Sequence, residues 1–323
     1  MEGVRKMSIE LAACPAYILA GLAGLYYGAE LLVKGGAALA RRAGVSPLVI
    51  GLTLVAFATS APETVVSVGA AIDGNADIAI GNIVGSNICN IALILGLCGC
   101  IAPMTVKRQL VRFDAPVMVA ATLLFMAFYR SAHGLSRLQG ALLLAGLVVY
   151  TVWNIRASRR ECAGEPPDGA APPPPLGRAL AFTALGLLGL IAGAKLFLAG
   201  TIWAAGKLGI PDAVIGLTVV AVGTSLPELA TSVVAALKRE NDIAIGNILG
   251  SNIFNILGIL GLAALTRPMR HASIDAVDLG MMLFLAAAML PILRSGWKLS
   301  RREGVFLLLV YIGYTAYLTL VRG

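Results

Sequence analysis

A stretch of 47 residues occurs twice in this chain, and this repetition limits what the chain can fold into. Residues 51–97 and 216–262 match at 30 of 47 positions when they are aligned at an offset of 165. Chance does not produce such agreement, even in apolar sequence where leucine, alanine and valine recur. The chain therefore consists of two related halves, each built around one copy of the repeat.

The composition is that of a membrane protein. Only 13% of the residues are charged and 58% are hydrophobic, whereas a soluble domain carries about 25% charged residues. Uncharged runs recur along the chain, each close to the roughly 20 residues that cross a bilayer as a helix. The period-two alternation of a strand barrel is missing. We therefore predict an all-α polytopic membrane protein.

The apolar runs predict ten transmembrane helices, five in each half. The expected helices lie near 11–33, 47–71, 78–101, 114–130, 135–155, 178–204, 211–238, 243–265, 274–294 and 303–321. The N-terminal half covers 1–155 and the C-terminal half covers 178–323. Residues 156–177 contain a run rich in proline and glycine, which predicts a flexible linker. Five is an odd number, so the halves should be inverted repeats related by a pseudo-two-fold axis in the membrane plane.

Basic residues predict the orientation of the chain. Of the 25 lysines and arginines, sixteen fall on the side of the linker and eight on the opposite side. Cytoplasmic loops accumulate positive charge, so we expect a cytoplasmic linker and both termini outside. The net charge of +8 is spread over short loops, which does not indicate nucleic acid. The expected surroundings are the lipid bilayer of the cell (inner) membrane, with no obligate protein partner.

Each copy of the repeat contains the motif T-S-x-P-E, at residues 59–63 and 224–228. A carboxylate at mid-membrane costs about 2.5 to 3.5 kcal/mol on insertion scales. Because of this cost, Glu63 and Glu228 are expected to have a function. The neighbouring prolines interrupt the helix and free carbonyl oxygens that lipid does not satisfy. A protonated structural glutamate or a simple proline kink explains one copy. Two copies in matching places of inverted halves favour a binding site.

A second motif, G-N-I-x-G-S-N-I-x-N, places polar side chains at four-residue spacing, hence on one stripe of a helix. These side chains are Asn82, Ser86 and Asn90, and in the second copy Asn247, Ser251 and Asn255. The glycines of this motif are better explained by close helix packing. Inversion would bring both motifs together, with oxygens only and no thiol or imidazole. Such ligands suit hard cations, and a dry cage with two carboxylates favours Ca²⁺ over Mg²⁺.

The paired motifs resemble the α-repeats of the calcium/cation antiporter superfamily, and most of all those of prokaryotic sodium/calcium exchangers. The resemblance covers the whole ten-helix plan and implies ions bound between the second, third, seventh and eighth helices. By position, it implies metal ligands at Glu63, Glu228, Thr59, Thr224, Ser60, Ser225, Ser86, Ser251 and Asn90, and carbonyl ligands at Ala56 and Ala221. Asn255 stands where some members, including potassium-dependent exchangers, have aspartate, and it forms a symmetric pair with Asn90.

These features predict a secondary antiporter that exchanges Ca²⁺ for Na⁺ by alternating access. The chain is not expected to be an enzyme, and no cofactor is expected besides the transported ions. Members coupled to protons resemble G-N-x-x-E, so T-S-x-P-E favours sodium. A proton-coupled Ca²⁺ antiporter, a cation channel and an intramembrane hydrolase are the alternatives.

The resemblance also implies that the first helices of the two halves slide across the core. Both helices contain glycines that are compatible with close sliding contact: Gly21, Gly24 and Gly28 in the first half, and Gly186, Gly189 and Gly193 in the second. Glu30 and Lys195 occupy matching positions on these helices but differ in sign. The sequence alone assigns them no role.

Overall fold

The computed structural model describes residues 2–130, 134–162, 174–207, 221–269 and 274–321. Within these ranges, eight helices are long and apolar enough to cross a membrane, and a ninth span is made by the bent pair Pro47–Thr59 and Ala61–Asp73. The all-α polytopic prediction is therefore confirmed. The expected helix at 211–238 begins outside the described residues, so the count of ten stays a prediction.

The elements of the first half are α1 (Glu2–Ala43), α2 (Pro47–Ile50), the π-helix η1 (Gly51–Val55), α3 (Ala56–Thr59), α4 (Ala61–Asp73), α5 (Ala76–Ile88), the π-helix η2 (Cys89–Leu95), α6 (Gly96–Ile101), β1 (Met104–Thr105), the π-helix η3 (Leu110–Asp114), α7 (Ala115–Tyr129) and α8 (Arg137–Cys162). Those of the second half are α9 (Leu176–Lys207), α11 (Ala221–Thr224), α12 (Leu226–Leu237), α13 (Asn241–Phe254), the π-helix η5 (Asn255–Leu260), α14 (Gly261–Thr266), α15 (Ala276–Arg294), β2 (Lys298–Leu299) and α16 (Arg301–Val321).

Several helices extend beyond the apolar runs that predicted them. The first helix, expected at 11–33, continues to Ala43, and α8 reaches Cys162 inside the predicted linker. Lysine and arginine are good helix formers, so hydropathy marks the apolar part of a helix and misses its charged end. The linker prediction is therefore wrong at its start. Residues 163–173 lie outside the described part of the chain.

The helix expected at 47–71 is broken at Ser60, where the two segments differ in direction by 52°. Pro62 is in the first turn of α4 and has no amide hydrogen, so the backbone ladder stops before it. Ser60 and Ser225 adopt nearly the same non-helical conformation, with φ, ψ of −81°, 14° and −88°, 10°. Each break begins a new helix with a glutamate in its first turn, where the helix dipole favours negative charge.

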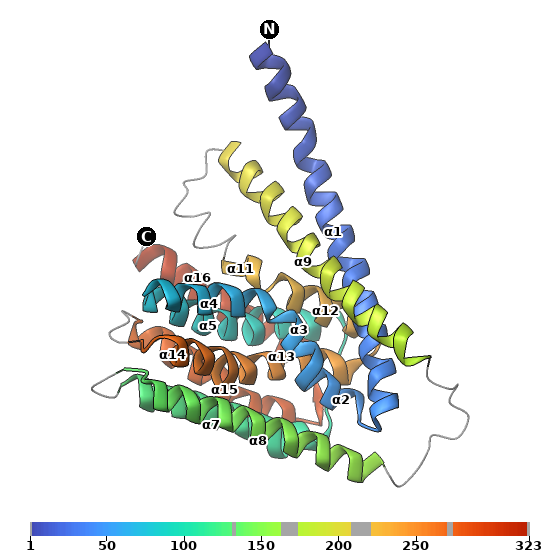
Figure 1. Ribbon diagram of the computed structural model, residues 1–323, viewed down its shortest axis with the longest axis vertical. Coiled ribbons are helices and arrows are strands. Elements are labelled where there is room, and N and C mark those ends of the chain that lie inside the picture. The colour runs from blue at the N-terminus through green and yellow to red at the C-terminus, as the bar shows by residue number, and fades with distance from the viewer. Residues whose placement is uncertain (1, 131–133, 163–173, 208–220, 270–273, 322–323) are drawn as a thin grey trace.

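The halves meet along α1 and α9, which pack side by side and run obliquely to the helices of the remaining bundle (Figure 1). The contacting glycines are Gly21 with Gly193, Gly24 with Gly189, and Gly28 with Gly186. At the offset of 165, Gly24 meets its own equivalent, Gly189, and the contact of Gly21 with Gly193 is equivalent to that of Gly186 with Gly28, as a two-fold interface requires. Since the numbering rises along α1 while it falls along α9, the helices are antiparallel and the halves are inverted.

The close packing of α1 on α9 predicts that Gly28→Ala lowers stability. An added Cβ would lie 2.6 Å from the Leu190 amide nitrogen and 2.9 Å from the Gly186 carbonyl oxygen. The helices must separate, which costs about 1–3 kcal/mol. The measurement is the melting temperature of the detergent-purified protein. Gly69→Ala is the control, because a Cβ there has no neighbour within 4 Å among the described residues. Equal melting temperatures for the two variants would contradict the prediction.

Candidate cation site

The two glutamates of the T-S-x-P-E motifs are buried, and each is bonded to a serine of the opposite half. Ser60 Oγ donates a hydrogen bond to Glu228 Oε1 at 2.7 Å, and Ser225 Oγ donates one to Glu63 Oε1 at 3.0 Å. Glu63 is 1% exposed and Glu228 is 0% exposed. The prediction that inversion brings the two motifs together is therefore confirmed, and the broken helices form a crossed pair of serine–glutamate contacts.

Four asparagines continue the two-fold arrangement. The side-chain nitrogens of Asn87 and Asn252 donate to each other's backbone carbonyls at 3.3 Å, so the axis passes between these equivalent residues. Asn90 Nδ2 donates to Asn252 Oδ1 at 3.0 Å, and Asn255 Nδ2 donates to Asn87 Oδ1 at 2.9 Å. Asn90 and Asn255 lie near the start of π-helices, an uncommon conformation found frequently at functional sites.

The predicted hydroxyl groups surround this centre, with one difference between the halves. Ser60 Oγ lies 3.1 Å from Ser251 Oγ, and Ser225 Oγ lies 3.4 Å from Ser86 Oγ. Thr59 Oγ1 donates to Asn247 Oδ1 at 3.0 Å. The equivalent hydroxyl, on Thr224, is buried and has no hydrogen-bond partner in the described part of the chain.

The predicted carbonyl ligands are less clear than the side chains. The Ala56 carbonyl accepts a hydrogen bond from the Ser60 amide at 3.0 Å. The Thr59 hydroxyl lies 3.3 Å from the same carbonyl, but its single proton is donated to Asn247 at the shorter distance of 3.0 Å. One lone pair of this carbonyl is therefore engaged by the Ser60 amide. Ala221 is the first residue of α11 and adjoins residues 208–220, which lie outside the described ranges.

Four residues of this network were not predicted from the sequence. Asn87 and Asn252 lie off the four-residue stripe. Ser67 and Ser232 accept hydrogen bonds from Asn82 and Asn247 respectively. All four are identical in the two copies of the repeat. Ser67 and Ser232 also follow the glutamates by four residues, hence on the same helix face. Identity between copies was the signal that would have identified them.

Four buried oxygens at this centre lack a hydrogen-bond donor in the described structure. They are Glu63 Oε2, Glu228 Oε2, Asn90 Oδ1 and Asn255 Oδ1. An unsatisfied buried acceptor costs about 1–3 kcal/mol, and more when it is charged. Among the described residues, no lysine or arginine pairs with either glutamate. These oxygens form two symmetry-related pairs, and a hard cation would satisfy both.

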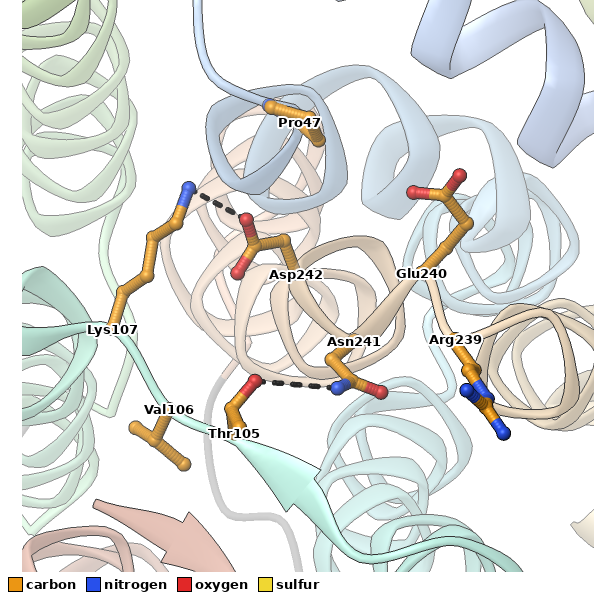
Figure 2. Close-up of a pocket in the computed structure, with 8 residues that line it drawn as sticks. All are labelled: Pro47, Thr105, Val106, Lys107, Arg239, Glu240, Asn241 and Asp242. Carbon is orange, nitrogen blue, oxygen red and sulfur yellow. Dashed lines mark hydrogen bonds and ion pairs between the residues drawn. The ribbon is translucent and has the colours of Figure 1, made fainter.

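A pocket of about 270 Å³ lies between the halves, where α13 begins (Figure 2). Two of its charged side chains, Lys107 and Asp242, are paired with each other across the two halves. Lys107 Nζ lies 2.6 Å from Asp242 Oδ2, and Asn241 Nδ2 donates to Thr105 Oγ1 at 3.3 Å. Because this carboxylate is paired with a lysine, the pocket fits a cation poorly, and the crossed serine–glutamate centre is the better candidate site.

One further carboxylate is buried away from this centre. Asp114 is 0% exposed and accepts hydrogen bonds from Tyr150 Oη at 3.0 Å and from Asn154 Nδ2 at 3.4 Å. Both of these donors belong to the first half, and no serine of the second half donates to Asp114 in the described structure. Asp114 therefore provides a buried carboxylate for comparison with the two glutamates.

Comparisons with known proteins agree with this geometry. The family model described as "Sodium/calcium exchanger protein" matches residues 14–156 and 178–320. The sodium/calcium exchanger MaX1 of Methanosarcina acetivorans is 34% identical, over 93% of this chain and 97% of that protein. The inner membrane protein YrbG of Escherichia coli is 36% identical, over 78% of this chain and 80% of that protein. A solved structure of the sodium-calcium exchanger NCX_Mj superposes with a TM-score of 0.83 at 33% identity, over 95% of this chain and 99% of that one.

The unsatisfied oxygens predict that Ca²⁺ raises the melting temperature of the purified protein, because a ligand of the native state stabilises it. Glu63→Gln and Glu228→Gln should each remove most of this rise, since each deletes one of the two buried charges. Asp114→Asn is the matched control and should keep the rise. A Ca²⁺-dependent rise that survives in both glutamine variants would place the cation elsewhere.

Proposed function

The chain belongs to the sodium/calcium exchanger protein family, and from this membership we propose that it is a secondary antiporter that exchanges Ca²⁺ for Na⁺ by alternating access. The observation that carries the proposal is the pair of buried glutamates, each held by a serine of the opposite half and each keeping one oxygen without a donor. An ion bound there contacts both inverted halves at once. A change in how the halves pack would therefore change the side of the membrane from which the bound ion is accessible.

The proposed ligands come from both repeats in matching pairs. They are Glu63 and Glu228, Thr59 and Thr224, Ser60 and Ser225, Ser86 and Ser251, Asn90 and Asn255, and the carbonyls of Ala56 and Ala221. The serine hydroxyls can donate to the glutamates and still present lone pairs to a cation. The Ala56 carbonyl accepts the Ser60 amide with one lone pair and would offer the other to the ion.

The asparagine network orients two of these ligands. Asn90 and Asn255 use their amide nitrogens on Asn252 and Asn87, which leaves each side-chain oxygen free. Hydrogen bonds that lock a rotamer in this way prepare a ligand before the ion arrives. The on-axis pair Asn87 and Asn252 therefore acts as a support for the proposed site.

Charge explains why the two ions would compete. Two carboxylates balance one Ca²⁺, whereas three Na⁺ in the same cage would leave one net positive charge. Each net charge that crosses is worth about 2.3 kcal/mol per 100 mV. Because the same oxygens serve both ions, binding of one excludes the other. The sodium gradient would then drive Ca²⁺ across the membrane, with export as the expected direction.

The proposed placement is the cell (inner) membrane, with both termini outside and the linker in the cytoplasm. The distribution of basic residues supports this orientation. The relative YrbG is named an inner membrane protein. The proposed division of the chain is a first half at 1–155, a linker within 156–177 that begins after α8, and a second half at 178–323.

The proposal predicts Ca²⁺ uptake by sodium-loaded vesicles that contain the purified protein when external sodium is low. Glu63→Gln and Glu228→Gln should each abolish this uptake, because one remaining carboxylate does not neutralise Ca²⁺ in a buried site. Radioactive Ca²⁺ retained by the vesicles is the measurement. Asp114→Asn serves again as the control and should keep most of the uptake.

Other outcomes of the same assay identify the alternatives. Calcium flux that ignores both the sodium and the proton gradient would indicate a channel. Uptake driven by a proton gradient with no sodium present would indicate a proton-coupled antiporter. Normal exchange by both glutamine variants would show that the ligand assignment is wrong.

A further inference from the structure

The two halves differ at one contact that their symmetry should make equal. The α1–α9 pair packs on α12, and both of its helices contact that segment. The repeat equivalent of α12 is α4, and in the described part of the chain neither α1 nor α9 packs against α4 to a comparable extent. The helix pair therefore lies toward one side of its two-fold axis.

An ion pair fixes α1 on this side. Lys238 Nζ, at the end of α12, lies 2.7 Å from Glu30 Oε1. Lys34 Nζ contacts the same oxygen at 2.7 Å from one turn further along α1. The second contact stays within one helix, whereas the first joins α1 to the other half. The Lys107–Asp242 pair also joins the halves, four residues beyond Lys238 (Figure 2). Two ion pairs therefore link the halves at this end of the molecule.

The same pair exists at the equivalent positions with both charges reversed. At the repeat offset of 165, Glu30 corresponds to Lys195 in α9, and Lys238 corresponds to Asp73 at the end of α4. The residue at each position differs between the halves, but the sign of the charge is reversed at both positions. Each half-to-half pair therefore still combines an acidic with a basic residue. Within the described residues, Lys195 and Asp73 form no ion pair in this conformation.

Each of these two residues is unfavourable where it stands. Lys195 is an exposed charge inside the apolar span Leu176–Ala204, where charged residues are rare and usually paired. Asp73 is the last residue of α4, and negative charge at a helix C-terminus opposes the helix dipole. Arg267 Nη1 donates to the Ile72 carbonyl there at 3.0 Å and caps the helix end. The Lys195 side chain could extend along the helix to place its ammonium group at the membrane surface. That would explain the lysine, but it would not explain why an aspartate occupies position 73, the equivalent of Lys238.

We propose that Glu30–Lys238 and Lys195–Asp73 are alternative ion pairs that hold the α1–α9 pair in its two end positions. In the conformation described here, the first pair is closed and the second is open. When the α1–α9 pair moves toward α4, the first pair breaks and the second forms. The four residues are thus positioning residues that set the side to which the cation site opens. This inference rests on the proposed exchange function and extends it.

Charge reversal tests the open pair. Lys195→Glu places two acids together in the second end position, and it should slow sodium-dependent Ca²⁺ uptake about two- to fivefold, the range expected for an exposed ion pair. Adding Asp73→Lys restores the pair with the charges exchanged and should recover uptake to within about twofold. Lys34→Gln, which removes only the contact inside α1, is the control and should leave uptake unchanged. A double variant as slow as the single variant overturns the proposal.

Cross-linking tests the distance directly and needs no transport. In a chain freed of its native cysteines, Glu30→Cys/Lys238→Cys should cross-link at rest. Asp73→Cys/Lys195→Cys should cross-link only as the second position is visited, and faster after Glu30→Gln has opened the first pair. Asp73→Cys/Ala192→Cys, one turn away on α9, is the matched control and should remain uncrosslinked. If the 73–195 pair never cross-links while the 30–238 pair does, the proposal is wrong.

The two failures are distinguishable. If Glu63→Gln still exchanges ions, the proposed site is wrong, but the cross-linking result still reports whether the helices move. If Glu63→Gln abolishes exchange and the charge-reversed double variant does not recover Ca²⁺ uptake, the proposed cation site is supported and the proposal of alternating ion pairs is wrong.

Discussion

The burial of two glutamate side chains in the interior of a membrane protein is the constraint that explains most of this structure. Neither Glu63 nor Glu228 has a lysine or arginine beside it in the described structure. Each instead receives a hydroxyl from the opposite half. This arrangement requires two broken helices, because an unbroken helix would not place Ser60 and Glu63 toward partners across the axis. The inversion of the two halves brings both breaks to one place in this structure.

The symmetry extends outward from that centre and decides how the molecule divides into rigid and movable parts. On the axis, Asn87 and Asn252 exchange hydrogen bonds and join α5 of the first half to α13 of the second. At the edge, α1 and α9 touch through glycine backbones. Interlocked side chains resist sliding, whereas a smooth glycine surface permits it. The core is thus joined by polar contacts on the axis, and in this conformation the outer helix pair is joined to it by the Glu30–Lys238 ion pair.

Much of this arrangement was predictable because a duplicated sequence reports symmetry directly. The offset of 165 predicted which residues are equivalent, and the odd helix count predicted inversion. The sequence did not predict the length of α1, since its charged end lies beyond the apolar run. It did not identify Asn87 and Asn252, because these two residues lie off the four-residue stripe, and only their identity in the two copies marks them. The π-helical turns around Asn90 and Asn255 were missed for a related reason: they depend on tertiary contacts, and the local sequence looks like ordinary helix.

The reversed charges at residues 30, 73, 195 and 238 have a consequence for the history of the chain. A homodimer made from one such half would carry the same residue at both equivalent positions, so its two ends would be chemically identical. Fusion of the halves into one polypeptide removes that restriction, and each end can then change on its own. An ancestor with two identical ends has no built-in preference for either face of the membrane. A descendant with unlike ends can rest with one face closed, and selection can then adjust that resting state without altering the ion ligands.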